Sequence, residues 1–227
     1  MAILRKSMEI SLSKIMDAKM IERLQKTAEF VKARRATTEA TGYVNPDFDY
    51  RWKHTLRVVQ YGKQLAEAEG ADVEVCMSAC LLHDISKFDA EEYGVEHGRV
   101  SARIARPFLE TLGYDEKRLN NICYSIAVHV DDKSDFEHPV TLESKIVSDA
   151  DNIDRFGAYR LLIQFSETDN YEKLVEKAAT RLLTLKKYRA GGIMGTAKGE
   201  ELFNRQLDVQ IHVLERLVED SQLTIEI

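Results

Sequence analysis

The chain has 227 residues, 44% of them hydrophobic and 31% charged, a composition typical of a globular protein with a substantial buried core. Its formal net charge of −6 argues against a broad surface for nucleic acid polymers, although a local basic pocket is compatible with it. No apolar run resembles a signal peptide or a membrane span, and the three cysteines fit free thiols better than a disulfide framework. We therefore expect a cytoplasmic protein without a membrane partner.

Apolar residues at helical spacing predict eight helices, and β-branched runs are too scarce to indicate a stable sheet. In chain order, the predicted helices cover residues 21–31, 50–69, 73–87, 100–112, 119–129, 142–156, 171–185 and 203–218. The helix 73–87 is nearly all apolar and is expected to be central, whereas Leu56, Val59 and Leu65 should face inward from the helix before it. Asn45-Pro46-Asp47 is expected to break the chain between the first two helices. The sequence thus predicts an all-α bundle that forms a single domain over residues 1–227.

A glycine-rich stretch, residues 189–199, holds four of the eleven glycines and is expected to be a flexible loop. It follows Lys186 and Lys187, so it fits a lid over a phosphorylated substrate as well as it fits a plain connector. It lacks the Gly-Lys-Ser/Thr ending of a phosphate-binding P-loop.

The apolar stretch 79–87 carries His83 and Asp84 side by side, with Lys87 three residues later. Imidazole and carboxylate are both good ligands for divalent cations, and a bound cation would offset the cost of burying a carboxylate among leucines. Taken alone, the pair fits a core histidine beside a capping or surface aspartate better than it fits a metal site.

Two further helices carry polar residues in apolar patterns. Arg51 and Arg57 lie about one turn either side of His54, which suits either a phosphate site or a solvated basic helix end. The helix 142–156 holds three aspartates within six residues, and some of these must face the core. Asp151 and Asp154, three residues apart, could present an acid and a base to one cleft.

The order of His54, then His83-Asp84, then an aspartate in Asp149-Ala150-Asp151 resembles the HD-domain metal-dependent phosphohydrolase superfamily. The resemblance runs from about Arg51 to Gly157, roughly half of the chain. The segment Leu-Leu-His-Asp-Ile-Ser-Lys resembles the central motif of the family, with serine where glycine is common. The resemblance implies an HD-type helical bundle with a motif-bearing core at about 50–157 and helical extensions on both sides.

This resemblance also implies a set of metal ligands. His54, His83, Asp84 and a final aspartate would bind one divalent ion, and because the last ligand of the family usually follows an alanine, Asp151 is favoured over Asp149. Manganese, iron, cobalt, nickel, zinc and magnesium all remain open.

Some branches of the family bind two ions and place two extra histidines between the central pair and the last aspartate, as His97 and His129 are placed here. Asp84 would then bridge the ions. Otherwise these histidines would contact substrate, act as acids or be ordinary structural histidines. Lys87 matches a lysine of the family that contacts phosphate or orients the aspartate. His138 and His212 match nothing and are expected at the surface.

The resulting hypothesis is metal-assisted hydrolysis of a phosphoester or phosphoanhydride, with a nucleotide as the expected small phosphorylated substrate. Asp84, Lys87 and His129 would be catalytic, and Arg51, Lys87 and Arg155 would hold phosphate oxygens. The alternatives are a di-iron oxygenase of the same fold and a regulatory module without turnover. The amphipathic terminal helices are compatible with a homodimer.

Overall fold

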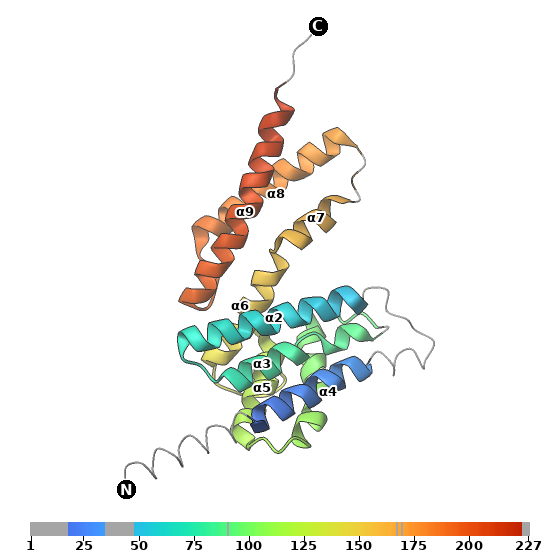
Figure 1. Ribbon diagram of the computed structural model, residues 1–227, viewed down its shortest axis with the longest axis vertical. Helices are drawn as coiled ribbons and strands as arrows, with labels where there is room; N and C mark the ends of the chain where they lie inside the picture. The colour runs from blue at the N-terminus through green and yellow to red at the C-terminus, as the bar shows by residue number, and fades with distance from the viewer. Residues whose placement is uncertain (1–17, 35–47, 90, 167, 169, 224–227) are drawn as a thin grey trace.

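The computed structural model describes residues 18–34, 48–89, 91–166, 168 and 170–223, and within these ranges it contains helices and no strand (Figure 1). Residues 18–34 are helical. The elements that follow are α2 (Phe48–Glu69), α3 (Val73–Leu82), the 3-10 turns Ile85–Phe88 and Gly94–Glu96, α4 (His97–Glu110), α5 (Glu116–Val128), α6 (Leu142–Arg155), α7 (Ala158–Ser166), α8 (Tyr171–Gly191) and α9 (Ala197–Ser221). The predicted all-α class is confirmed. The expected break at residues 45–47 lies outside the described residues.

Helix α3 is the centre of the lower part of the molecule in Figure 1, as its apolar sequence predicts. It packs against α2, α5 and α6, and its residues are buried except for Val73 and Met77. Asp72 caps its first turn by accepting hydrogen bonds from the backbone N–H groups of Glu74 and Val75. Helix α3 is therefore the central helix against which α2, α5 and α6 pack.

The C-terminal end of α3 differs from the prediction. The helix ends at Leu82 rather than at Lys87, and the chain turns through His83 and Asp84 into a 3-10 turn. The apolar run continues past the helix because the turn is itself buried against α4, where the Ser86 hydroxyl donates to the carbonyl of His97 at 3.0 Å. A continuous apolar run therefore shows burial without showing where a helix stops.

Two other predictions of local structure were wrong in part. Leu56 is 45% exposed and faces outward, whereas Val59 is partly buried and Leu65 fully buried. The glycine-rich loop is shorter than expected, because α8 continues to Gly191 and α9 begins at Ala197. Helix α8 stops where Gly192 takes a left-handed conformation with φ of 63°, which favours glycine.

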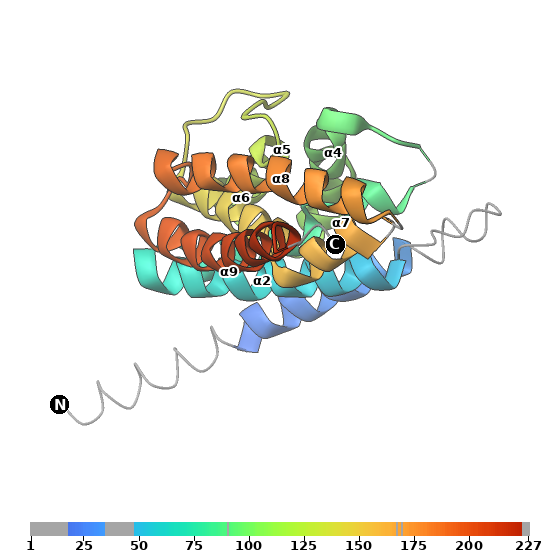
Figure 2. The same cartoon turned by 90° about the horizontal axis from the view of Figure 1, so that it is seen from above.

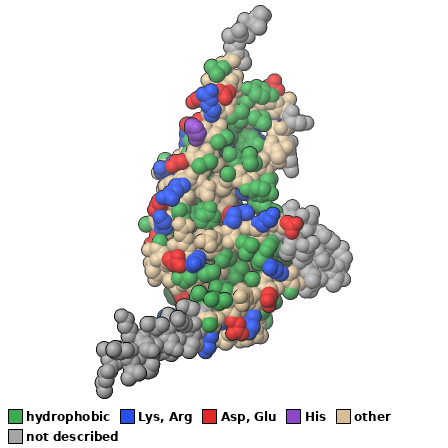
Figure 3. Space-filling view, in the orientation of Figure 1, with side chains coloured by type: hydrophobic (Ala, Val, Ile, Leu, Met, Phe, Trp, Pro, Cys, Tyr) green, Lys and Arg blue, Asp and Glu red, His purple; other side chains and the backbone are tan. Residues whose placement is uncertain are grey.

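Helices α8 and α9 pair along their lengths and rise away from the lower part of the molecule, with α7 beside them (Figures 1 and 2). Sequence analysis missed α7, a nine-residue helix in which only Leu161 is buried. Hydrophobic side chains lie exposed over this upper part in Figure 3, and the exposed residues of α7 and α8 include Tyr159, Leu162 and Leu183. Within the described ranges, no helix combines the length and apolar character that crossing a bilayer requires.

Asp149 of α6 anchors the start of α9. Its carboxylate accepts hydrogen bonds from the backbone N–H of Gly195 at 2.8 Å and from the backbone and hydroxyl of Thr196 at 2.9 and 2.6 Å. The side chain is buried, and Gly199 leaves the room for it, because a Cβ at Gly199 would lie 2.2 Å from Asp149 Oδ2. This contact fixes the α8–α9 pair on the lower part of the molecule.

We expect Asp149→Asn to lower the free energy of unfolding by about 1–3 kcal/mol, because an amide cannot satisfy the three donors that face this buried carboxylate. Urea denaturation of the full chain measures the effect. Asp208→Asn is the matched control, since it weakens an exposed ion pair with Arg189 and should cost below about 1 kcal/mol. Equal midpoints for the two variants would contradict the anchoring role.

Candidate metal centre

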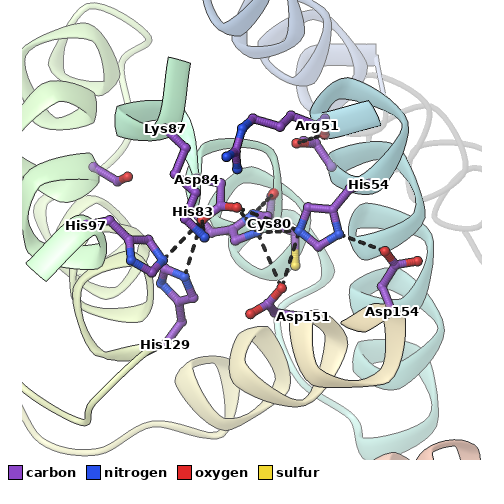
Figure 4. A network of polar contacts seen from close by, with 12 residues as sticks. Arg51, His54, Cys80, His83, Asp84, Lys87, His97, His129, Asp151 and Asp154 are labelled. Carbon is purple, nitrogen blue, oxygen red and sulfur yellow. Dashed lines mark hydrogen bonds and ion pairs between the residues drawn. The ribbon is translucent and has the colours of Figure 1, made fainter. Parts of the chain in front are cut away.

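Four histidines and two aspartates from five separate segments converge in the lower part of the molecule (Figure 4). They are His54 of α2, His83 and Asp84 after α3, His97 at the start of α4, His129 after α5 and Asp151 of α6. All six side chains are buried. The structure thus brings together every residue that the resemblance implied as a metal ligand.

Three of the imidazole rings are oriented in the same way. In His83, His97 and His129, Nδ1 lies 2.8, 2.6 and 2.7 Å from the backbone carbonyl oxygen three residues earlier. A carbonyl can only accept, so Nδ1 carries the proton and donates it. In the neutral form of each ring, Nε2 is therefore the unprotonated nitrogen, and Figure 4 shows these rings pointing toward the centre of the cluster.

His54 is oriented by a carboxylate instead. Its Nδ1 lies 2.7 Å from Asp154 Oδ2, and Asp154 is held in turn by Arg57 through two hydrogen bonds of 2.5 and 3.0 Å. Its Nε2 faces inward, 3.2 Å from His83 Nε2 and 3.3 Å from Asp151 Oδ1. A carboxylate behind a histidine is the usual support for a histidine that binds a metal.

Asp84 lies between two groups of nitrogens. Its Oδ2 is 3.6 Å from His83 Nε2 and 3.7 Å from His54 Nε2. On the other side, its Oδ1 is 3.2 Å from His97 Nε2 and 3.8 Å from His129 Nε2. Two overlapping sets of atoms are close enough to hold an ion, namely His54 with His83 and Asp151, and His83 with Asp84 and His129.

The cluster fits a divalent cation on chemical grounds. It is built almost entirely from electron-pair donors, and His129 Nε2 is buried without a hydrogen-bond partner among the described residues. Inward-facing lone pairs and carboxylates repel one another unless a cation or protons lie between them. Imidazole with carboxylate is the ligand set of several first-row divalent metals.

The ionisation of these groups follows from burial and from one another. Burial lowers the pKa of His83 to about 4, which keeps that ring neutral. Burial also works against the charged form of His54, but hydrogen bonds to Asp151 and Asp154 outweigh it and raise the pKa to about 9. Although burial opposes its ionisation, Asp84 has a pKa well below the usual range because of His83, its other histidine neighbours and Lys87. The carboxylate at the centre is therefore ionised.

Cationic side chains lie at the edge of the cluster. Arg51 turns its guanidinium toward the centre in Figure 4, and its Nε is buried with no hydrogen-bond partner in the described part of the chain. Lys87 Nζ lies 3.0 Å from Asp84 Oδ1. Arg155 is farther out, with 57% of its side chain exposed and Nη1 3.8 Å from Asp151 Oδ2.

The other polar residues that the sequence analysis singled out lie outside the cluster of four histidines and two aspartates. Asp149 and Asp151 are two positions apart on α6, and only Asp151 reaches the cluster. Arg57 holds Asp154 rather than lying free beside Arg51. His212 is exposed as expected, whereas His138 is partly covered by stacking on Tyr124, with ring centroids 4.7 Å apart.

Sequence analysis missed the supporting role of Asp154, which it interpreted as half of an acid–base pair. The signal was available in the spacing, since Asp154 lies one turn after Asp151 and Arg57 lies one turn after His54. Only the packing of α2 against α6 shows that these two pairs meet.

Comparison with known proteins agrees with this geometry. The family model described as the HD domain matches residues 51–155. The uncharacterized protein MJ0778 of Methanocaldococcus jannaschii is 36% identical over 138 residues, which cover 55% of this chain and 75% of that protein.

Solved structures share the fold. An HD-superfamily hydrolase from Bacillus thuringiensis aligns with a TM-score of 0.64 at 21% identity, covering 90% of this chain and all of that one. YpgQ of Bacillus subtilis, crystallised in complex with ADP, aligns with a TM-score of 0.59 at 18% identity over 89% of this chain and 96% of that one.

The pair His97 and His129 depends on a close approach of α4 to α5 at Gly98. A Cβ at Gly98 would lie 2.6 Å from the carbonyl oxygen of Ala127 and 3.2 Å from His129 Nδ1. We expect Gly98→Ala to bind fewer manganese ions than the wild-type chain, because α4 must move and carry His97 with it.

Elemental analysis after dialysis measures the bound manganese in this variant. Gly191→Ala is the control, because a Cβ at that position has no neighbour within 4 Å, and it should bind the wild-type amount. A wild-type manganese content in Gly98→Ala would contradict the dependence on this helix contact.

Proposed function

The chain belongs to the HD-domain superfamily, and we propose that it is a divalent-metal-dependent phosphohydrolase that cleaves a phosphoester or phosphoanhydride bond of a nucleotide. The observation that carries the proposal is the buried cluster of inward-facing imidazole nitrogens with two carboxylates. The ADP bound to YpgQ, a protein of similar fold, supports a nucleotide as the substrate.

The ligand set offers two overlapping groups of atoms, each of which could hold an ion. His54, His83, Asp84 and Asp151 would hold the first, and His97 with His129 would hold a second that shares Asp84. A bound divalent ion supplies a Lewis acid that polarises a phosphoryl oxygen and acidifies water at its surface. Manganese, iron, cobalt, nickel and zinc suit imidazole with carboxylate, and magnesium is included because phosphate substrates often bring it.

The cationic side chains would hold the substrate. Arg51 and Lys87 lie on the same side of the cluster in Figure 4, where they can bind the non-bridging oxygens of a phosphoryl group. Arg155, which is largely exposed, would contact a more distant part of the substrate. If only one ion binds, His97 and His129 remain free to donate a proton to the leaving oxygen.

The test is release of phosphate and pyrophosphate by the purified full chain. Nucleoside mono-, di- and triphosphates would each be supplied with manganese, cobalt, magnesium or ferrous iron. Release from one of these classes supports the proposal and identifies the bond that breaks. Bound iron with a mixed-valence spectroscopic signal and no release would instead favour the oxygenase alternative, which the paired sites around Asp84 keep open.

We expect Asp84→Ala to lose both bound metal and turnover, because it removes the one carboxylate that contacts both groups of nitrogens. Metal content and phosphate release are measured on the same preparation, with circular dichroism as the check on folding. His212→Ala, which alters an exposed histidine of α9, should keep both properties. Turnover retained in Asp84→Ala would overturn the assignment of this cluster as the active site.

We expect Asp154→Ala to weaken metal binding by about 10–100-fold, because His54 loses the acceptor that orients its ring. Metal titration of the chelator-treated protein measures the affinity. Glu74→Ala is the matched control, since it breaks a similar carboxylate–arginine pair, with Arg23, away from the cluster. Equal loss of metal affinity in both variants would mean that the effect is general destabilisation.

A further inference from the structure

A stack of tyrosine rings leads outward from the metal centre. We propose that Tyr159 binds the base of the nucleotide substrate by stacking, with Tyr50 and Arg57 holding its ring in place. This inference rests on the proposed nucleotide substrate, and it identifies which residues would recognise the part of that substrate that does not react.

The rings form a nearly parallel series that begins at a residue of the cluster. Tyr50 lies one helical turn before His54 on α2, and the two ring centroids are 6.2 Å apart with an interplanar angle of 16°. Tyr159 of α7 continues the series, 5.4 Å from Tyr50 at an angle of 20°. A substrate that has its phosphoryl group at the metal centre and extends along the side of His54 would therefore meet these tyrosines next.

Guanidinium groups hold both rings before any substrate arrives. The Cζ of Arg160 lies 5.7 Å from the Tyr50 ring centroid, and that of Arg57 lies 6.0 Å from the Tyr159 ring centroid. Arg57 is itself fixed by its two hydrogen bonds to Asp154, so the position of Tyr159 is tied to the support behind His54. A preorganised aromatic surface loses less entropy when it binds a ligand.

The outer ring remains accessible in spite of these contacts. Tyr159 is 53% exposed, whereas Leu161 of the same helix is buried. The helix itself packs against α9 and buries Leu161, so Tyr159 is free to serve another purpose. An exposed, immobilised aromatic ring beside a phosphate site is suited to stacking with a planar base.

Stacking on such a ring predicts a particular specificity. A base that stacks on an aromatic side chain gains about tenfold in affinity, and every base has a π-face. The interaction should therefore separate nucleotides from sugar phosphates while tolerating different bases. Hydrogen-bond readout of base edges would instead separate one base from another.

The experiment compares AMP with ribose 5-phosphate, which lacks the base and keeps the sugar and phosphate. Binding to the magnesium-loaded full chain is followed by ligand-observed NMR, and phosphate release is measured separately in the same samples. We expect AMP to bind about tenfold more tightly than ribose 5-phosphate in the wild-type chain.

Tyr159→Ala should remove most of that difference by weakening AMP alone, whereas Tyr159→Phe keeps the ring and should keep the difference. Tyr171→Ala is the matched control, because Tyr171 is 57% exposed at the start of α8 and should leave both affinities unchanged. Unchanged binding of ribose 5-phosphate by Tyr159→Ala would show that its loss of AMP affinity does not come from misfolding.

The outcomes separate this inference from the proposed hydrolysis. Equal affinities for the two ligands, absent AMP binding, or an unchanged ratio in Tyr159→Ala would each overturn the stacking role, even if phosphate is released. Base-dependent binding that Tyr159→Ala abolishes would establish it, even if no substrate of the panel is hydrolysed.

Discussion

The repulsion among buried electron-pair donors is the constraint on which the rest of this structure depends. Four imidazole nitrogens and two carboxylates point at one another in a buried region. Without a cation or protons between them this arrangement is costly, and the fold must supply rigid supports to hold it together. The helices around α3 are arranged to provide those supports.

The supports come mainly from backbone groups at helix ends. The last carbonyls of a helix have no partner within the helix, and His83 and His129 use such carbonyls at the ends of α3 and α5 to orient their rings. The same two helix ends direct the negative end of their dipoles toward the cluster, which favours a cation there. His97, which begins α4, uses the carbonyl of the preceding 3-10 turn in the same way.

This arrangement explains what could be predicted from the sequence. The apolar spacing predicted the helical class and most of the helices, because burial produces that spacing directly.

The aspartates of α6 show what the spacing of residues cannot predict. Asp149 and Asp151 are two residues apart, so they point to nearly opposite sides of the helix, yet both are buried. One reaches the cluster and the other anchors α9, and only the positions of the neighbouring helices distinguish them. The resemblance, not the spacing, favoured Asp151.

The surroundings of the cluster are asymmetric, and that asymmetry bears on how a substrate would lie. Lys87 and Arg51 offer positive charge on one side, whereas Tyr50 and Tyr159 offer aromatic surface beside His54. Charge suits a phosphoryl group, and aromatic surface suits a planar base. In the proposed complex the two sides thus impose one orientation, with the phosphoryl group between Arg51 and the metal ligands and the nucleoside directed toward α7.

Arg57 links the proposed metal site to the proposed base site, because the same guanidinium contacts the carboxylate behind His54 and the ring of Tyr159. In the proposed complex, a base stacked on Tyr159 and a metal held by His54 would therefore depend on the same guanidinium for their support.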